Sequence, residues 1–367
     1  LKSSMTHGWP APPIRMATGI ATGISLLVVC ELRVARRYAV TANALDAAGI
    51  AILFSTFFAA HTLWKLINAP TTFALLALVT ATAVMLSIRR ASLFIATLGL
   101  LGGFSTPALI STGENNPIGL FGYLFVLNAG LGWVAYRKRW PLLTAASLLF
   151  TTLYQWGWVD RFLTSGQLPL AIGIFLVFPV LSFASLIFGE RRASATDESH
   201  APSQWERIFA RSASIAAALP LAFAVYLATV PAYGGRFALL FGFLLVLDIG
   251  LAAIALFRGP QWLHLAGAAA AAVTWVSWLY QSDGPQAWPW VLILIAPFVA
   301  LYLATPWIAE RLKRPLTGNG STDRAAYAAP VLLFAFPVLV AVEPRVASPF
   351  MMFGALLTML VACAWFA

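Results

Sequence analysis

The chain has 367 residues, of which 60% are hydrophobic and only 10% are charged. A soluble domain carries about 25% charged residues, so this composition excludes a soluble protein and requires lipid around most of the surface. The net charge of +10 is typical of cytoplasmic loops rich in Lys and Arg, and it does not indicate a nucleic-acid partner.

Membrane-spanning helices are the expected elements, because lipid leaves free backbone groups unsatisfied and one span needs about 20 mostly apolar residues. We therefore predict an all-α polytopic integral membrane protein with about thirteen transmembrane helices. They are expected at 14–31, 44–67, 70–88, 91–111, 117–136, 141–158, 168–189, 211–232, 236–257, 261–281, 288–308, 326–342 and 348–366.

The basic residues favour one orientation of these spans. Most Lys and Arg residues lie in alternate loops, as in the turn RKRW at 137–140. Such loops face the cytoplasm. The sequence thus predicts a multi-pass protein of the bacterial inner membrane, with its N-terminus outside and its C-terminus in the cytoplasm.

An internal repeat is indicated by residues 120–131 (LFGYLFVLNAGL), which align with 240–251 (LFGFLLVLDIGL) and bring Asn128 opposite Asp248. Continuing the alignment brings Trp156 opposite Trp278. The period is about 120 residues, or four spans. An even number of spans gives parallel four-helix repeats related by an axis along the membrane normal.

The repeat suggests a division of the chain into units. We expect an outside segment at 1–13, a divergent first four-helix unit at 14–116, a second unit at 117–232, a third unit at 233–346 and a final helix at 347–367, which we expect to be truncated. Polar cytoplasmic linkers are expected at 190–210 and 310–325, where Ser, Thr, Pro or Gly are frequent.

The stretch GGFSTPALISTGENNP at 102–117 is the first candidate site. Pro107 removes a backbone hydrogen bond and weakens the helix near its outer end. Interrupted helices expose backbone groups that coordinate ions or substrates. The alternative is a helix end and a tight turn, in which Asn116 caps a helix that starts at Pro117. The candidate functional residues here are Thr106, Pro107, Glu114, Asn115 and Asn116, and Glu114 is the single acid of the loop.

Asp248 is the second candidate, because a carboxyl in the middle of a span is costly to bury. It is expected either to relay a proton or cation with a nearby His, or to form an interhelical hydrogen bond. Asn128 at the matching position is the corresponding candidate in the other copy, and its neutral amide favours the structural role.

Two further acids, Glu31 and Asp46, lie near the cytoplasmic boundary, and we expect snorkelling ion pairs with Arg33, Arg36 and Arg37. His61 and His264 have no partner at metal-ligand spacing, so no metal site is expected. Cys30 and Cys363 lie in separate apolar segments without a CxxC motif, which indicates neither a disulfide nor a metal site.

Aromatic residues gather near the expected outer ends of the spans, where an interfacial belt is the usual explanation and a sugar or headgroup platform the alternative. They are Trp64, Tyr154, Trp156, Trp158, Tyr233, Trp275, Trp278, Tyr280, Trp288 and Trp290. The sequence holds no nucleotide-binding loop, HExxH motif or nucleophile elbow. We therefore expect no cofactor and no catalytic residues, and an enzyme is disfavoured.

The run GGFSTPALISTGENNP, the helix LFGYLFVLNAGL and the turn RKRW together resemble a family of bacterial polytopic membrane proteins, domain of unknown function 2339. The likeness covers roughly residues 98–160. It implies an inner-membrane protein and brings no reaction, substrate or site residue with it.

The duplicated bundle, the interrupted helix and Asp248 together favour a transporter-like function. A scaffold or assembly partner of cell-envelope machinery is the alternative, indicated by the polar linkers and the lack of catalytic motifs. A second alternative is an enzyme acting on lipid-linked sugars, indicated by the outer aromatic residues. The lipid bilayer is the expected partner, with a small-molecule or lipid substrate, and the sequence identifies no protein partner.

Overall fold

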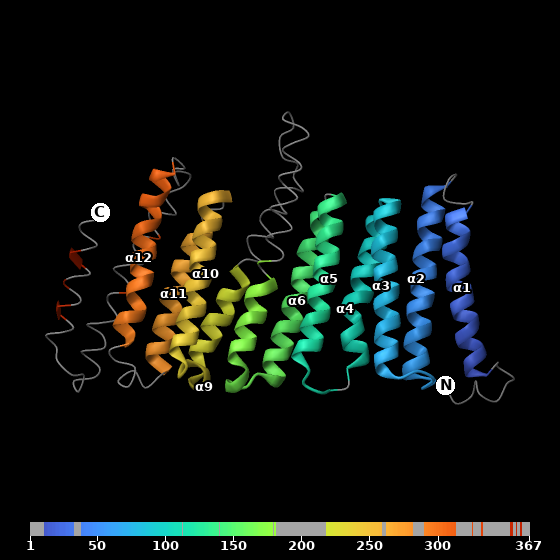
Figure 1. Cartoon of the computed structure of the whole chain (residues 1–367), viewed down its shortest axis with the longest axis horizontal. Coiled ribbons are helices and arrows are strands. Elements are labelled where there is room, and N and C mark those ends of the chain that lie inside the picture. The colour runs from blue at the N-terminus through green and yellow to red at the C-terminus, as the bar shows by residue number, and fades with distance from the viewer. Residues whose placement is uncertain are drawn as a thin grey trace. The chain divides into compact units, whose positions relative to one another are not determined.

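A computed structural model describes residues 11–32, 38–111, 113–138, 140–178, 218–258, 262–281 and 290–312, with residue 180 and isolated positions beyond 312. Every regular element in these ranges is a helix (Figure 1), which confirms the all-α class. The helices are α1 (Pro12–Leu32), α2 (Ala39–Thr62), α3 (Ala69–Arg90), α4 (Leu93–Ile110), α5 (Pro117–Lys138), α6 (Pro141–Phe162), α9 (Pro231–Gly234), α10 (Phe237–Arg258), α11 (Trp262–Gln281) and α12 (Trp290–Arg311), with a 3-10 turn η3 at Ser165–Gln167.

Seven helices within the described ranges are long and apolar enough to cross a membrane, namely α1 to α5, α10 and α11. The chain is thus a multi-pass membrane protein. α6 and α12 are also helices of 22 residues, at the places of the predicted spans 141–158 and 288–308. Of two shorter apolar helices, Ser165–Phe178 overlaps the predicted span 168–189 and Ala218–Thr229 lies within the predicted span 211–232.

Several predictions fall on parts of the chain outside the described residues. These are most of the N-terminal segment, the linker 190–210, nearly all of the linker 310–325, and the last two spans apart from isolated helical positions. The count of about thirteen helices and the four-helix units therefore stay predictions.

The boundary of α2 differs from the prediction and has a local cause. The helix ends at Thr62, five residues before the predicted end of the span 44–67. Lys65 adopts a left-handed backbone with φ of 51°, which a helix cannot contain. Asn68 then caps α3, since its side-chain oxygen accepts the Thr71 N–H at 3.0 Å.

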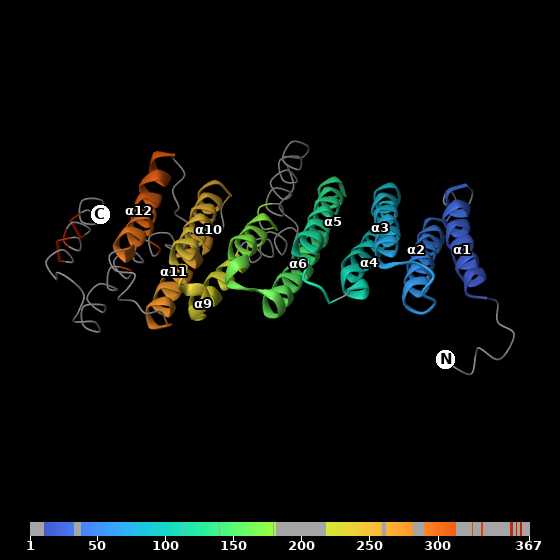
Figure 2. The same cartoon turned by 60° about the horizontal axis from the view of Figure 1, so that its bottom comes forward.

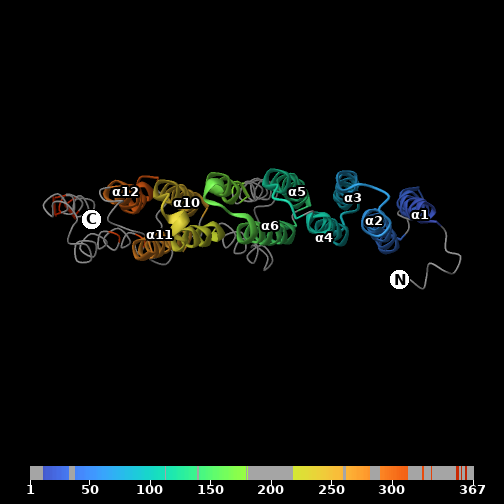
Figure 3. The same cartoon turned by 90° about the horizontal axis from the view of Figure 1, so that it is seen from below.

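The described helices belong to two compact units. The first contains α1 to α5 and α6 as far as Trp158, and the second contains the chain from Val159 with α9 to α12. In the first unit, α2 contacts α1, α3 and α4, while α3 contacts α4 and α5. Figure 3 shows the matching arrangement, with α3 and α5 in one row and α2 and α4 in the other. α2 and α3 thus each contact the next two helices in sequence.

The core of the first unit is made where α2, α3 and α4 meet, and its buried residues are Ile50, Leu53, Phe57, Leu76, Val79, Ala83 and Ile95. α1 packs closely on α2 through two glycines. A Cβ on Gly23 would lie 3.1 Å from the Gly49 carbonyl oxygen, and a Cβ on Gly49 would lie 3.0 Å from the Gly23 carbonyl oxygen. Small residues at this crossing let the two backbones approach, as is usual between helices in lipid.

In the second unit, α10 contacts α9, α11 and α12, and Figure 2 shows α10 and α11 side by side. Aromatic rings fill the space between them. Phe241 of α10 stacks on Trp275 of α11 with 3.8 Å between ring centroids, and Trp278 packs edge-on against Phe241 at 5.4 Å. Both tryptophan side chains are 1% exposed, so α10 and α11 form a tightly packed pair.

Candidate functional site

The first candidate region is centred on Pro107, and α4 runs through it without a break to Ile110. Proline has no N–H, so the carbonyl of Gly103, four residues earlier, loses its helical donor. The Tyr123 hydroxyl from α5 donates to that carbonyl oxygen at 2.9 Å. The interruption of the helix predicted at Pro107 is corrected, because α4 is continuous there and the Tyr123 hydroxyl replaces the missing donor.

The two neighbouring carbonyls of α4 are also occupied. Thr106, which is completely buried, donates to the Gly102 carbonyl oxygen at 2.8 Å, and Tyr154 from α6 donates to the Phe104 carbonyl oxygen. Three hydroxyls thus cover three successive backbone oxygens. The described contacts favour a structural role for Thr106 and Pro107 over coordination of an ion or substrate.

The loop after α4 is fixed by asparagine side chains. The Asn116 side-chain oxygen accepts the Gly119 N–H at 2.9 Å, which confirms the predicted cap of α5. The Asn115 side-chain oxygen accepts the Trp158 indole N–H from α6, also at 2.9 Å. Glu114 is exposed in the same loop. Asn115 and Asn116 therefore hold the turn.

Asn128 lies in the buried interface of α5 and α6. Its amide nitrogen donates to the Leu124 carbonyl oxygen and to the Thr151 hydroxyl, at 2.8 Å in each case. Thr151 in turn donates to the Ser147 carbonyl oxygen at 2.7 Å. The amide joins two helices and has its donor used, which is the interhelical hydrogen bond expected of a polar residue in lipid.

Asp248 occupies a different environment in the second unit. Its side chain is 1% exposed in α10. The Tyr302 hydroxyl from α12 donates to its Oδ2 atom at 2.6 Å, while its Oδ1 atom has no hydrogen-bond partner among the described residues. The Oδ1 atom faces α11, since a Cβ on Gly267 would lie only 2.5 Å from it.

His264 completes this buried polar group. It lies one turn before Gly267 on α11, is 1% exposed, and its ring centroid is 5.6 Å from that of Tyr302. Its Nε2 atom has no partner among the described residues. An acid and an imidazole, each with an unpaired atom, thus converge from α10 and α11 beside a tyrosine from α12. Buried unpaired polar atoms are rare and are a mark of functional sites.

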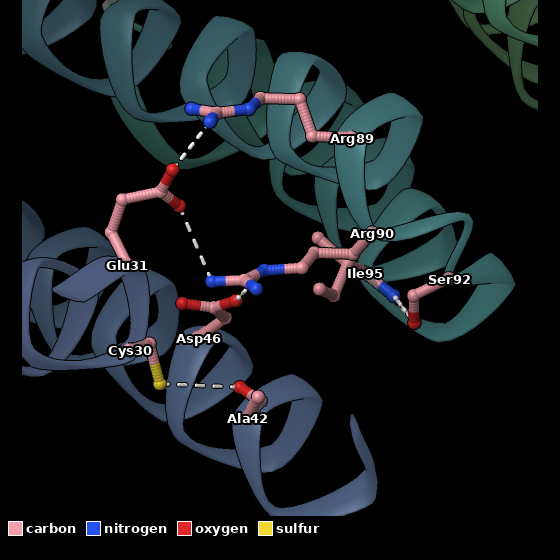
Figure 4. Close-up of polar contacts among 8 residues, drawn as sticks. All are labelled: Cys30, Glu31, Ala42, Asp46, Arg89, Arg90, Ser92 and Ile95. Carbon is pink, nitrogen blue, oxygen red and sulfur yellow. Dashed lines mark hydrogen bonds and ion pairs between the residues drawn. The ribbon is translucent and has the colours of Figure 1, made fainter. Parts of the chain in front are cut away.

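A further polar cluster joins α1, α2 and α3 (Figure 4). Arg90 donates to Asp46 at 3.1 Å and to Glu31 at 3.3 Å, and Arg89 also pairs with Glu31. Asp46 is completely buried. Ion pairs were predicted for both acids, but the partners are Arg89 and Arg90, while Arg33, Arg36 and Arg37 lie outside the described residues.

The aromatic belt predicted for the outer ends of the spans needs correction for three of its members. Trp158 is 4% exposed, and Trp275 and Trp278 are each 1% exposed. They are core residues of their own units, because their rings pack against phenylalanines of neighbouring helices. Tyr280, by contrast, is 87% exposed, which fits an interfacial position.

The candidate residues therefore separate into two groups. The first unit contains Asn128 of α5 and the residues around the end of α4, namely Thr106, Pro107, Glu114, Asn115 and Asn116, and the second unit contains Asp248. Tyr302 was not among the predicted residues, although a single tyrosine in the apolar run VALYLAT is a signal that could have indicated it. No group of three or more potential metal ligands exists among the described residues.

The chain matches the model of a known protein family. The family model described as "Predicted membrane protein (DUF2339)" matches residues 1–233, which include α1 to α6. α10 to α12, which carry Asp248, His264 and Tyr302, follow the matched part. No curated protein and no solved structure matches the chain.

Proposed function

We propose that this chain, which belongs to the DUF2339 family of predicted membrane proteins, is an inner-membrane transporter whose moving ion is a proton. The observation that carries the proposal is Asp248. Its carboxyl group is buried in the middle of a membrane helix, and its Oδ1 atom has no partner among the described residues. A buried carboxyl group is neutral while it carries a proton. An oxygen without a fixed hydrogen bond can release or accept that proton with little reorganisation of its surroundings.

The contacts of Asp248 support proton carriage more than a fixed structural bond. Tyr302 occupies Oδ2 and holds the carboxyl in one orientation, which leaves Oδ1 as the atom that gains and loses the proton. Asn128, in the comparable place of the first unit, makes two hydrogen bonds through its amide nitrogen. Asp248 instead accepts one hydrogen bond through Oδ2 and leaves Oδ1 without a partner among the described residues.

A metal cation is a poorer candidate for this place. Na⁺ and divalent cations require several oxygen ligands. The described contacts of Asp248 are the Tyr302 hydroxyl and the close approach of Gly267, and His264 lies beside Tyr302. The close approach of Gly267 also limits the space beside Oδ1. This donor set suits a proton.

The test is proton flux into liposomes that contain the purified full chain, an internal pH-sensitive dye and a potassium diffusion potential. We expect the wild-type protein to carry protons and Asp248→Asn to reduce the initial rate at least tenfold. Gly242→Ala serves as the folded control, because a Cβ there meets no atom within 4 Å. Equal rates for the wild type and Asp248→Asn would overturn the proposal.

The same assay decides between the two candidate regions. Glu114→Gln should leave the proton flux unchanged, since Glu114 is exposed in a loop. Loss of flux in Glu114→Gln with normal flux in Asp248→Asn would move the site to the α4–α5 loop and contradict the assignment made above.

A further inference from the structure

The helix pairs α5–α6 and α10–α11 bury side chains at corresponding positions, which are separated by a constant 120 residues in the sequence. α5 and α10 each have 22 residues, starting at Pro117 and Phe237. The buried pairs are Phe121/Phe241, Leu124/Leu244, Leu127/Leu247, Asn128/Asp248 and Leu131/Leu251 on the first helix, and Leu143/Leu263, Thr144/His264, Leu148/Ala268, Thr151/Ala271 and Trp158/Trp278 on the second.

Contacts at one end of each pair agree with the same separation. Trp158 packs edge-on against Phe121 with ring centroids 5.7 Å apart, and Trp278 packs edge-on against Phe241 at 5.4 Å. Each indole N–H donates at 2.9 Å to the segment before the first helix of its pair, Trp158 to Asn115 and Trp278 to Gly234.

This correspondence differs from the alignment of the sequence, which brings Trp156 opposite Trp278. The turn from Arg137 to Trp140 is one residue shorter than the turn from Arg258 to Trp262, so matching the basic and aromatic residues of the turns shifts the second helix. Matching the buried faces instead keeps the separation at 120 throughout and brings Thr144 opposite His264.

Two buried positions differ together between the helix pairs. The first pair has the neutral residues Asn128 and Thr144, and the second has the acid Asp248 and the base His264. All four side chains are buried. Within one chain, the ionisable acid and the ionisable base are thus both present or both absent. Joint occurrence of the acid and the base is expected if the two side chains act together.

We propose that His264 is the proton-transfer partner of Asp248, and that α5–α6 is the neutral, non-transporting counterpart of the same structure. This inference depends on the proposed function and adds a second proton-binding residue to it. In the step, protonated Asp248 loses the proton from Oδ1 and becomes a carboxylate, and neutral His264 gains it and becomes an imidazolium. The imidazolium then releases one proton from a ring nitrogen, which restores the neutral imidazole.

The geometry supports this order of events. The Oδ1 atom faces Gly267, and residues three apart on a helix lie on the same face about 5–6 Å from each other. Tyr302 remains bonded to Oδ2 and stabilises the carboxylate that forms. His264 lies two residues from the start of α11 at Trp262, so the histidine is closer than Asp248 to the end of the helix pair that carries Arg258.

The variants that test the proposal come from the counterpart helices. Asp248→Asn and His264→Thr each introduce the residue that the first pair already accommodates at a buried position. Thr144→Ala is the matched control in the first pair. Proton flux is measured between pH 5 and pH 8 in the liposome assay, and each variant is first shown to be monodisperse and helical in detergent. His264→Gln, which keeps a polar side chain of similar size, is measured in parallel in case His264→Thr fails to fold.

We expect both His264 variants to slow proton flux at least tenfold and to lose its pH dependence, while Thr144→Ala behaves as the wild type. Infrared difference spectra between low and high pH provide a readout besides flux. The band of the protonated carboxyl should disappear in Asp248→Asn and remain in the His264 variants.

The outcomes separate the two proposals. Normal flux with an unchanged pH profile in both His264 variants, together with loss of flux in Asp248→Asn, would overturn the role of His264 and leave the proposed function standing. Normal flux in Asp248→Asn would overturn both. Loss of flux in Thr144→Ala would contradict the assignment of α5–α6 as the non-transporting counterpart.

Discussion

The Tyr123 hydroxyl lies 2.9 Å from the carbonyl oxygen of Gly103 and replaces the backbone donor that Pro107 lacks. A proline inside a membrane helix is tolerated when a neighbouring helix satisfies the freed oxygen. The tyrosine of α5 therefore belongs to the hydrogen bonding of α4, and the interruption seen in the sequence is repaired by tertiary structure.

Because the Tyr123 hydroxyl replaces the missing backbone donor, its removal should destabilise the protein. Tyr123→Phe should lower the free energy of unfolding by about 1 kcal/mol, because interhelical hydrogen bonds in membranes are worth roughly that much. In a Pro107→Ala background the same change should cost less, since the backbone N–H restored at position 107 donates to Gly103. Unfolding in detergent micelles measures both costs, with Tyr280→Phe as the exposed control. Equal costs in the two backgrounds would show that Tyr123 does not compensate for the proline.

A second prediction concerns the unequal roles of Arg89 and Arg90. The Arg90 side chain is 16% exposed and pairs with the buried Asp46, whereas the Arg89 side chain is 68% exposed. Removing one partner of a buried ion pair leaves an uncompensated charge and costs about 3–5 kcal/mol, while an exposed pair contributes about 0–1 kcal/mol.

Arg90→Ala should therefore destabilise the first unit strongly, and Arg89→Ala should change its stability little. Asp46→Asn combined with Arg90→Ala should recover much of the loss, because no carboxylate is then left without its cation. Unfolding measured by loss of helical circular dichroism tests all three variants. An Arg89→Ala variant as unstable as Arg90→Ala would contradict the assignment of Arg90 as the central cation.

Local signals explain which features were predictable from the sequence. The α5 helix was predicted to begin at Pro117 and does so, since proline at the first turn and an Asn116 cap are both local. The ends of α3 and α4 were likewise predicted to within about two residues. The early end of α2 was not predicted, because the apolar residues near Leu63 do not indicate the left-handed conformation of Lys65.

The contacts that define the candidate site depend on packing between distant segments. Tyr302 and Asp248 are 54 residues apart in sequence, and Arg89 and Glu31 are 58 apart. Periodicity identifies Asp248 as a buried acid, but the angle and depth at which α12 crosses α10 decide which side chain reaches it. Arg33, Arg36 and Arg37 were predicted as partners of Glu31 because they are close to it in sequence. Arg89 and Arg90 are distant in sequence and reach Glu31 only through the packing of α3.

A third prediction uses the glycine beside Asp248. Gly267→Ala should displace the carboxyl group, because the added Cβ would lie 2.5 Å from Oδ1, and we expect it to weaken the bond to Tyr302 and to reduce proton flux. Overpacking a well-packed interior costs about 1–3 kcal/mol.

Gly250→Ala on α10 is the matched control, since a Cβ there meets no atom within 4 Å. An alanine in a helix is favoured over glycine by about 0.5–1 kcal/mol. The measurements are unfolding in detergent and flux in liposomes. Equal effects of the two changes would contradict the close approach of α10 and α11.

The last prediction compares the two tryptophan hydrogen bonds, which are alike in length but differ in surroundings. Trp158 donates to Asn115, an exposed side chain, and Trp278 donates to the backbone carbonyl of the buried Gly234. Replacing either tryptophan by phenylalanine removes the N–H donor and keeps an aromatic ring. In Trp158→Phe, water can take over the freed oxygen of Asn115, so the cost comes mainly from the smaller ring.

In Trp278→Phe the Gly234 carbonyl is left buried without its donor, and an unsatisfied buried acceptor costs about 1–3 kcal/mol. We therefore expect Trp278→Phe to lower the free energy of unfolding more than Trp158→Phe. Hydrogen exchange should also increase at the amides of α9 in the first variant and around residues 113–116 in the second. If Trp158→Phe proves the more destabilising of the two, ring packing against Phe121 outweighs the hydrogen bond, and burial of the acceptor does not determine the cost.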